Sequence, residues 1–570
     1  MKRIPMYAFL FLMVMFISLP AHAQSITWNT DQMLSVSTEI HTHHNVAVSG
    51  DRAVAVWVNR IDGFTRIFAS YSTDRGETWS APQLIENRTA HARNPRVAMS
   101  GSKVVVIWEQ MTPTIYKVYA NYSTNGGATW LATASPLVLS ETTGWDVSQT
   151  SVAISGDRVV VVWRQSPDGT YEGIYANRSS DSGATWGTSF QISDYTSADV
   201  PQVAISGSNV VAVWRQSAPA NDNYFLVRTN YSTNGGATWQ DAAWIENPTA
   251  EESSRPQVAV SGNNVVAVWD TWDGSYLHIH SNRAAFSGGA LAWNTANVQL
   301  LEEDETDYYD YDAKIAMSGN DVIVLWQRED IGGNLWLQTV RSGNAGSSWS
   351  SPATLDSNAA SFQPLHQLIM TDRYAVAIWQ YRDVFIGKIR VSSSFDRGEN
   401  WTDPETIENS TIYDSGNPQI AASGNNIVSV YSTWDSDESE SIIYANSASY
   451  SGGGFIVLAD GGGGGCFIAT TAFGSPMAGQ VDILRKFRDG YLLTNGPGRK
   501  FVDWYYQNGP AAAKFIENKP LAKAFVQASL YPLVGFSFLL INGYLPFVMI
   551  GLMLAALIFF RFRPGKSGAR

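Results

Sequence analysis

One pattern recurs along most of the chain and constrains its fold more than any other feature. It is a short apolar run, a Ser-Gly turn and a second apolar run that ends in Trp, as in VAISGDRVVVVW at residues 152–163. Seven copies follow this scheme, with Thr-Asp replacing Ser-Gly in the seventh, and an eighth, IAASGNNIVSVY at 420–431, ends in Tyr. Repeats on this scale are typical of solenoids and propellers.

Each copy is followed by a second pair of apolar runs, so a unit of roughly 54 residues predicts four antiparallel strands. Such a sheet cannot bury both faces alone, but units stacked around an axis can. We therefore predict an all-β propeller at 24–459, with eight blades favoured over seven. An open solenoid is the alternative. It would not need the half-unit near Ile26–Val36, which we expect to complete the last blade and close the ring.

The turn between the third and fourth runs has the pattern S-x-D-x-G-x-T-W, and it resembles the Asp box, the bacterial neuraminidase repeat of sialidase-like proteins. The resemblance covers about residues 25–456. It implies that these turns are structural and lie opposite the ligand face. The positions that carry it, with Asn replacing Asp in two of the turns, are Asp74, Gly76, Trp79, Asn125, Trp130, Asp181, Trp186, Asn234, Trp239, Asp396 and Trp401.

The residue types in this turn have direct structural uses. Asp or Asn can accept backbone N–H bonds across a hairpin, and Gly permits a positive φ. The Trp is expected to fill the space between neighbouring blades and to bury a large apolar area.

The likeness to sialidases raises the question of a catalytic site. It implies three arginines around the substrate carboxylate, a Tyr–Glu nucleophile and an acidic acid/base residue. The expected Arg-Ile-Pro triplet is absent from the first blade, and Arg255-Pro256 in the fifth is the nearest match. Three arginines lie one or two positions after the Trp that ends the second run and could reach the ligand face: Arg164, Arg215 and Arg328. An exo-sialidase therefore stands as the alternative function.

A binding function requires fewer specific residues than catalysis, and it is the leading hypothesis. Trp145 lies between blades, whereas Trp272 and Trp434 lie in loops between the second and third strands. Both loop classes share the predicted ligand face, where exposed Trp beside Asp suits a sugar ring. These rings could instead pack onto their own loops. The predicted ligand-binding residues, for a glycan or an envelope protein, are Trp145, Trp272, Trp434, Arg164, Arg215 and Arg255. A purely structural module is the third possibility.

Metal sites are weakly indicated, and no cofactor is predicted. Acidic clusters at 304–312 and 435–440 could hold Ca²⁺, although neither matches an EF-hand loop. His41, His43 and His44 lack the further ligands that a zinc site needs. Solvated loops are the simpler interpretation of both features.

Charge is distributed unevenly along the chain. The net charge is −13, but residues 461–570 carry +8 and the remainder carries −21. The acidic body argues against nucleic-acid binding, whereas a basic tail suits anionic lipid headgroups. Residues 1–23 have the basic start, apolar run and Ala-His-Ala end of a signal peptide. The single cysteine permits no internal disulfide, so stability must come from packing.

The C-terminal part differs in composition. A glycine linker at 460–465 precedes residues 466–540, which resemble the bacterial C-terminal family named for its Cys-Phe-Ile box. Cys466 starts the box as a small apolar residue or as a processing or attachment point. Residues 541–560 are long enough to span a bilayer, and the basic residues 561–570 place the C-terminus in the cytoplasm. The predicted location is the bacterial inner membrane, in a single pass, with the propeller in the periplasm or exposed outside.

Overall fold

The described part of the chain is the repeat region. The computed structural model describes residues 25–451 together with residue 530, and within the first range it leaves out 38–42, 87–89, 141–144, 167–168, 195, 219–220, 248–251, 303–306, 360–364, 384–385, 409–413 and 436–439. The predicted signal peptide, glycine linker, Cys-Phe-Ile-box domain, membrane helix and basic tail, with Cys466, lie outside these residues. Among the described residues, no helix has the length and apolarity needed to cross a membrane.

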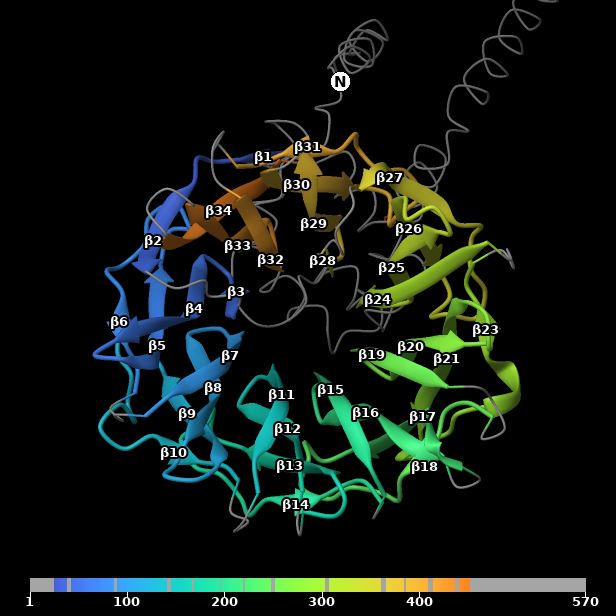
Figure 1. Ribbon diagram of the computed structural model, residues 1–570, viewed down its shortest axis with the longest axis horizontal. Helices are drawn as coiled ribbons and strands as arrows, with labels where there is room; N and C mark the ends of the chain where they lie inside the picture. The colour runs from blue at the N-terminus through green and yellow to red at the C-terminus, as the bar shows by residue number, and fades with distance from the viewer. Residues whose placement is uncertain are drawn as a thin grey trace, which may run out of the picture. The chain divides into compact units, whose positions relative to one another are not determined.

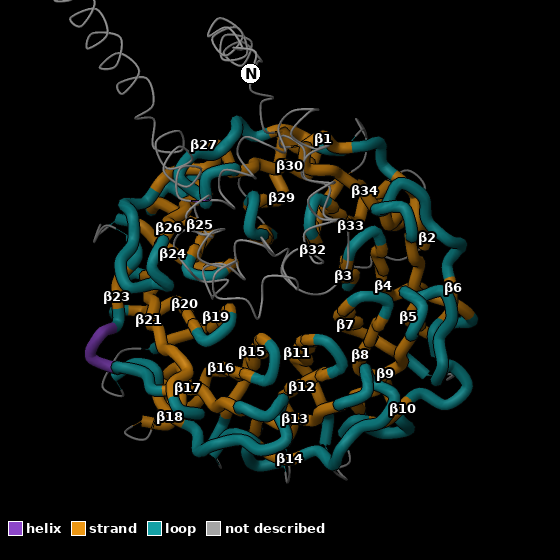
Figure 2. The backbone as a smooth tube through the Cα atoms, turned by 180° about the vertical axis from the view of Figure 1, so that it is seen from behind, coloured by secondary structure: helices purple, strands orange, loops and turns teal. Residues whose placement is uncertain are grey.

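Eight antiparallel sheets surround a common centre, which confirms the prediction of eight blades (Figures 1 and 2). In blades 1 to 4 the strands run outward from the centre in chain order. They are β3 (His44–Ser49), β4 (Arg52–Ile61), β5 (Phe64–Ser72), β6 (Gln83–Leu84); β7 (Ala92–Ser100), β8 (Lys103–Met111), β9 (Tyr116–Ser123), β10 (Leu137–Val138); β11 (Val147–Ser155), β12 (Arg158–Gln165), β13 (Gly173–Ser179), β14 (Phe190–Gln191); and β15 (Ala198–Ser206), β16 (Asn209–Ala218), β17 (Asn221–Ser232), β18 (Ala243–Trp244).

Blades 5 to 8 repeat this order, with an extra short strand in blade 5 and two N-terminal strands in blade 8. A single 3₁₀ turn, η1 (Thr295–Asn297), precedes β23. The strands are β19 (Ser253–Ser261), β20 (Asn264–Trp272), β21 (Leu277–Ser287), β22 (Ala290–Leu291), β23 (Gln299–Leu300); β24 (Tyr308–Ser318), β25 (Asp321–Asp330), β26 (Leu335–Ser342), β27 (Ala353–Ala359); β28 (His366–Met370), β29 (Ala375–Asp383), β30 (Ile386–Ser394), β31 (Glu405–Thr406); and β32 (Asp414–Ser423), β33 (Asn426–Asp435), β34 (Glu440–Ser451), β1 (Ser25–Trp28), β2 (Gln32–Ser37).

The second strand of each blade is apolar on both faces because a neighbouring blade covers each face. In blade 3 it reads RVVVVWRQ, and Val159 through Trp163 are fully buried. Such continuous apolar runs are typical of strands with both sides covered. The Trp that ends each run is buried in all seven blades that carry it, and Tyr431 takes its place in blade 8 at 1% exposure. The aromatic residue that ends the second strand is therefore buried in all eight blades, from the first to the last.

The glycine-rich turns lie where they were predicted, and their Trp side chains pack between neighbouring blades. Trp79, Trp130 and Trp186 are half-buried and pack at the margin of cores shared by two blades. The fully buried wedge is the second-strand Trp, for example Trp163 beside Val105 of the preceding blade. The predicted packing of these rings between neighbouring blades is therefore confirmed, although the second-strand Trp is the more deeply buried of the two.

The turn of blade 3 shows why its residue types recur. Asp181 Oδ1 accepts hydrogen bonds from Ser179 Oγ at 2.7 Å and from the Thr185 backbone N–H at 2.9 Å. Its Oδ2 accepts from Thr185 Oγ1 at 2.6 Å. Gly183 has φ +89, and a Cβ there would lie 2.7 Å from Cγ2 of Val105 in the preceding blade. Glycine is therefore required at position 183 for two reasons: the positive φ of the backbone and the lack of space beside the neighbouring blade.

Substituting this glycine should cost more than its backbone conformation alone explains. We expect Gly183→Ala to lower the free energy of unfolding by about 2–3 kcal/mol, because strain at positive φ adds to an inter-blade clash. Gly156→Ala is the matched control: Gly156 has φ +61 but nothing within 4 Å of a Cβ, so about 1 kcal/mol is expected. Urea unfolding of both variants measures the difference. Equal losses would contradict the contact with Val105.

The N-terminal strands close the ring, as predicted. Both β1 and β2 pair with β34 of the last blade, and Leu34 packs in a core with Trp57 of blade 1 and Ile443 of blade 8. His44 reinforces the same seam by donating from Nε2 to the Asn417 carbonyl at 2.6 Å. Burial lowers the pKa of His44 to about 4, so the ring is neutral. His44 is thus a seam residue.

The Ser-Gly turns form a second link between blades. In five seams the glycine N–H donates to the serine Oγ of the preceding blade's turn, at 2.8–3.0 Å. One of these bonds, Gly50 N–H to Ser423 Oγ, joins the first blade to the last. In blades 1, 4 and 5 the same turn serves both as a donor and as an acceptor, which gives the Ser-Gly pair a use in linking blades.

Candidate functional site

The strand order fixes which loops share a face. In an antiparallel blade the connection into the first strand and the hairpin between strands two and three lie at the same end. The Ser-Gly turns and the glycine-rich Trp turns lie at the opposite end, and Arg75 N–H donates to the Asp51 carbonyl between two of them. We call the first end the loop face. It carries all the connections that were predicted to bind a ligand.

Three aromatic rings gather on the loop face where blades 5 and 6 meet. The rings of Trp272 and Tyr309 are nearly parallel, with an interplanar angle of 5° and centroids 6.4 Å apart. Tyr276 tilts against Tyr309 at 5.4 Å. All three side chains are partly exposed. Together they form an aromatic platform, defined here as Trp272, Tyr276 and Tyr309.

A tight turn holds two of these rings. Asp273 Oδ1 accepts hydrogen bonds from the backbone N–H groups of Ser275 and Tyr276, both at 2.7 Å. The Asp273 N–H donates to the Tyr276 carbonyl at 3.1 Å, which closes the turn. This pattern is an Asx turn and gives the loop a defined shape. Trp272 and Tyr276 thus leave the turn from fixed positions on either side of it.

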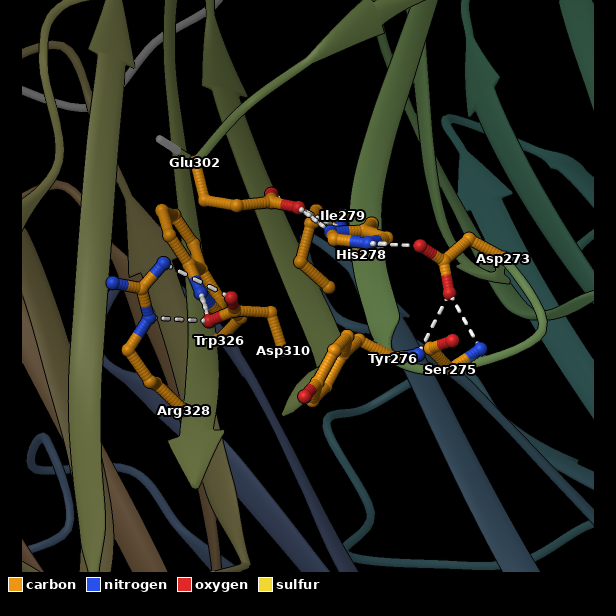
Figure 3. Close-up of polar contacts among 9 residues, drawn as sticks. All are labelled: Asp273, Ser275, Tyr276, His278, Ile279, Glu302, Asp310, Trp326 and Arg328. Atoms are coloured by element: carbon orange, nitrogen blue, oxygen red, sulfur yellow. Dashed lines mark hydrogen bonds and ion pairs between the residues drawn. The ribbon is translucent and has the colours of Figure 1, made fainter. Parts of the chain in front are cut away.

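His278 anchors this turn to the body of the blade (Figure 3). Its Nδ1 lies 2.9 Å from Glu302 Oε1, and its Nε2 lies 3.2 Å from Asp273 Oδ2. The hydrogen bond to Glu302 raises the pKa of His278 to about 9, with the Asp273 carboxylate contributing. Burial raises the pKa of Glu302 to about 6, which still leaves it ionised at neutral pH. His278 is therefore a cation between two carboxylates.

The His278–Glu302 ion pair has equivalents in two other blades. The position just before the third-strand Ile carries Arg66 in blade 1 and Lys388 in blade 7, and these bond Glu86 and Glu408 as His278 bonds Glu302. Blade 4 has the acid without the cation. There Leu226 replaces the basic residue, and burial raises the pKa of Glu246 to about 7.

This comparison predicts a pH dependence that is specific to His278. A raised folded pKa means that the stabilisation is complete below pH 6.5 and is lost as pH rises through about 9. We expect the wild-type protein to lose on the order of 2 kcal/mol between pH 6.5 and 9.5 relative to His278→Lys, which keeps its charge as Lys388 does. Urea unfolding across this range tests it. Parallel curves for the two proteins would contradict the assignment.

The three predicted arginines lie at the loop face, and each is neutralised by an acid. Arg164 pairs with Glu172 of its own hairpin. Arg215 binds Asp199 through Nε at 2.7 Å and Nη2 at 2.8 Å. Arg255 pairs with Asp270, and burial raises the pKa of that carboxyl group to about 6. The structure thus places these guanidinium groups in three blades, each held by a carboxylate.

Tyr308 begins β24, so the segment 308–312, which was expected to belong to a solvated loop, is a strand. Tyr311 donates to Glu329 Oε2 at 2.7 Å, and the Arg255 guanidinium lies 5.4 Å from the Tyr311 ring centroid. Burial, reinforced by Glu329, raises the pKa of Tyr311. A Tyr–Glu pair beside an arginine is therefore present, with the phenol held in its neutral form.

The predicted tryptophans do not converge. Trp145 lies in the connection into blade 3, Trp272 in blade 5 and Trp434 at the end of β33 in blade 8. Trp145 is 49% exposed, and its ring packs so closely on Gly169 that a Cβ there would lie 2.4 Å from Cζ2. Trp434 is half-buried. Among the described residues, Trp272 is the one of the three that is joined by other aromatic rings.

Two described residues of the first acidic cluster have cationic partners. Asp310 bonds Arg328 through Oδ1 at 2.9 Å and through Oδ2 at 3.0 Å, and it also accepts from Trp326 Nε1 at 2.6 Å (Figure 3). Asp312 bonds Lys314 at 2.6 Å. No group of three acidic, His or Cys side chains suited to a metal occurs in the described ranges. Parts of both predicted Ca²⁺ clusters, at 304–306 and 436–439, lie outside them.

Sequence reasoning missed the His278–Glu302 pair, although a signal for it exists. Aligning the units places Arg66, His278 and Lys388 in one column before the third-strand Ile. An acid follows the fourth-strand Ile or Leu in the same blades. Reading the two columns together would have indicated a recurring ion pair.

Comparisons with known proteins return structural neighbours of low similarity. No protein-family model matches the chain, and no curated protein sequence is similar to it. A protein of unknown function from Dyadobacter fermentans is 13% identical over 76% of this chain and 100% of its own, with a TM-score of 0.38. Trypanosoma rangeli sialidase with sialic acid is 10% identical over 74% of this chain, with a TM-score of 0.35, and the match spans 59% of the sialidase chain.

The neighbours also include a second glycosidase. The GH93 α-L-arabinofuranosidase of Fusarium graminearum with arabinobiose is 13% identical over 53% of this chain and 92% of its own, with a TM-score of 0.36. Similarity at this level says nothing about activity. Function is therefore argued from the residues of this chain.

Proposed function

We propose that this propeller is a glycan-binding module that uses the aromatic platform on its loop face. The observation that carries the proposal is the nearly parallel, partly exposed pair formed by Trp272 and Tyr309, with Tyr276 beside it. Aromatic rings of this kind offer a flat apolar surface for the C–H face of a sugar. Asp273, whose side chain is 46% exposed, stands next to Trp272 and can accept hydrogen bonds from hydroxyls.

The rigid setting of the platform supports binding. The Asx turn and the His278 anchor fix the rings before a ligand arrives, which reduces the entropy lost on binding. A ligand site held by a buried ion pair on a closed ring of sheets needs little rearrangement.

A glycan array probed with the purified protein, followed by calorimetry with the best ligand, tests this function. We expect Trp272→Ala to weaken the affinity about 30-fold, as truncation of a central aromatic contact does. Leu131→Ala is the control, because Leu131 is 54% exposed but lies at the opposite end of blade 2. Thermal unfolding should show that both variants stay folded. An array without any bound glycan would refute the proposal and favour a structural module.

An exo-sialidase is the second candidate, favoured by the Tyr311–Glu329 pair beside Arg255. Turnover of a fluorogenic sialoside that is lost in Tyr311→Phe would establish it over simple binding. The neutralised arginines weigh against it, because a substrate carboxylate would have to displace Glu172, Asp199 or Asp270.

The remaining parts of the chain complete the proposal. We propose that residues 1–23 direct export, that the turns belong to the Asp-box class, and that residues 466–560 form a Cys-Phe-Ile-box domain and an inner-membrane helix. The support is the sequence pattern together with the basic residues 561–570. Envelope fractionation tests the anchor, and recovery of the intact protein without membranes would refute it.

A further inference from the structure

The largest exposed aromatic side chains of the described residues share the loop face and adjacent blades. Trp145 and Tyr171 are each 49% exposed, and Tyr224 is 46% exposed. Trp145 precedes the first strand of blade 3, Tyr171 lies in the second hairpin of blade 3, and Tyr224 lies near the equivalent hairpin of blade 4. The aromatic platform follows at blades 5 and 6. Exposed rings therefore occur on four consecutive blades.

The ring of Trp145 packs closely against the backbone at Gly169. Gly169 of the blade 3 hairpin lies beneath it, and a Cβ at that position would be 2.4–2.8 Å from three atoms of the indole. The ring is thus held by this contact while about half of the residue remains exposed. This is a second fixed aromatic surface, formed by different loops from those of the platform.

The charges between the rings indicate the class of ligand. Carboxylates neighbour the aromatics: Glu172 follows Tyr171, and Asp273 follows Trp272. The arginines of this region, Arg164, Arg215 and Arg255, are all occupied by acids. The centres of protein–protein interfaces are depleted in charge, so this mixture of rings and carboxylates fits a hydroxyl-rich ligand better. Its acidity disfavours a polyanion.

We propose that the ligand is an extended, uncharged glycan chain that lies across blades 3 to 6 and contacts both aromatic surfaces. This inference rests on the proposed function and adds the length and charge of the ligand to it. The platform binds one segment of the chain. Trp145, Tyr171 and Tyr224 bind further segments, so affinity grows with chain length.

Calorimetry with neutral chito-, cello- and malto-oligosaccharides of increasing length tests the proposal. Affinity for at least one series should rise with length beyond the disaccharide. Trp145→Ala and Tyr224→Ala should each weaken the longest oligomer about tenfold and leave the shortest bound oligomer unchanged. Trp272→Ala should weaken every length. Ile331→Ala is the control on the same face, because Ile331 is aliphatic and 73% exposed, and it should change nothing.

The outcomes separate the two levels of the argument. Binding that depends on Trp272 but not on length or Trp145 would overturn the extended site and leave the proposed function standing. Tighter binding of polygalacturonate than of every neutral chain would overturn the uncharged class. Retention of no glycan by the wild-type protein, on the array or in solution, would overturn both proposals.

Discussion

Trp163→Ala is expected to lower the free energy of unfolding by about 4 kcal/mol, the loss typical of a large aromatic removed from a core. Trp163 is fully buried between blades 2 and 3, and its ring stacks on Tyr175 with centroids 6.3 Å apart. Its Nε1 donates to Gln165 Oε1 at 2.9 Å, so the variant also leaves a buried amide with one partner fewer. Both neighbours of the cavity are sheets, which cannot collapse into it.

Trp186 provides the matched control within the same blade. It is half-buried at the margin of the same core and donates from Nε1 to the Gly183 carbonyl at 3.0 Å. Trp186→Ala should therefore cost about 1–2 kcal/mol. Urea unfolding of the two variants measures the contrast. Equal losses would mean that the glycine-rich turn, and not the second strand, supplies the principal wedge.

Deleting residues 25–37 is expected to have a larger effect, with a loss of at least about 5 kcal/mol and of a single cooperative unfolding transition. The deletion removes β1 and β2 and exposes the hydrogen-bonding edge of β34. It also removes Leu34 from the core that joins blades 8 and 1. The open edge should pair with a second copy of the chain, because exposed strand edges template such contacts.

A synthetic peptide of residues 25–37 makes the test specific. Added to the deleted protein, it should restore the monomer and part of the lost stability, because it supplies the missing strands in trans. A scrambled peptide of the same composition is the control. A deleted protein that stays monomeric and unfolds at the wild-type urea concentration would show that the other seams hold the ring without this strand.

The sequence predicted the blades because strand position and burial are encoded locally. The run Val159–Trp163 is apolar at every position, which already implies cover on both faces, and Tyr431 marks the eighth copy despite its different ring. The last unit lacks a fourth strand of its own, and the half-unit at the start supplies one. Its pairing with the last blade could therefore be predicted from the number of strands in each unit.

The site was less accessible to such reasoning because it depends on pairings between strands and, for Trp272 and Tyr309, between blades. Trp272 and Arg255 were identified, yet their partners Tyr309 and Asp270 are set by the register and by contacts between strands. The arginine that suggested substrate binding is neutralised by an acid that only the folded register brings beside it. His278 looked like an ordinary strand residue until Glu302 and Asp273 were placed on either side of it.

The serine–glycine bonds at five seams run in one direction around the molecule, because each glycine N–H donates a hydrogen bond to the serine of the unit before it. A duplicated Ser-Gly unit inserted at one of these five seams would find a compatible partner on each side. Each of these bonds joins only two successive turns, so the bonds do not limit the number of blades. Growth by duplication is limited instead by the curvature at which the first strands can still meet the last sheet.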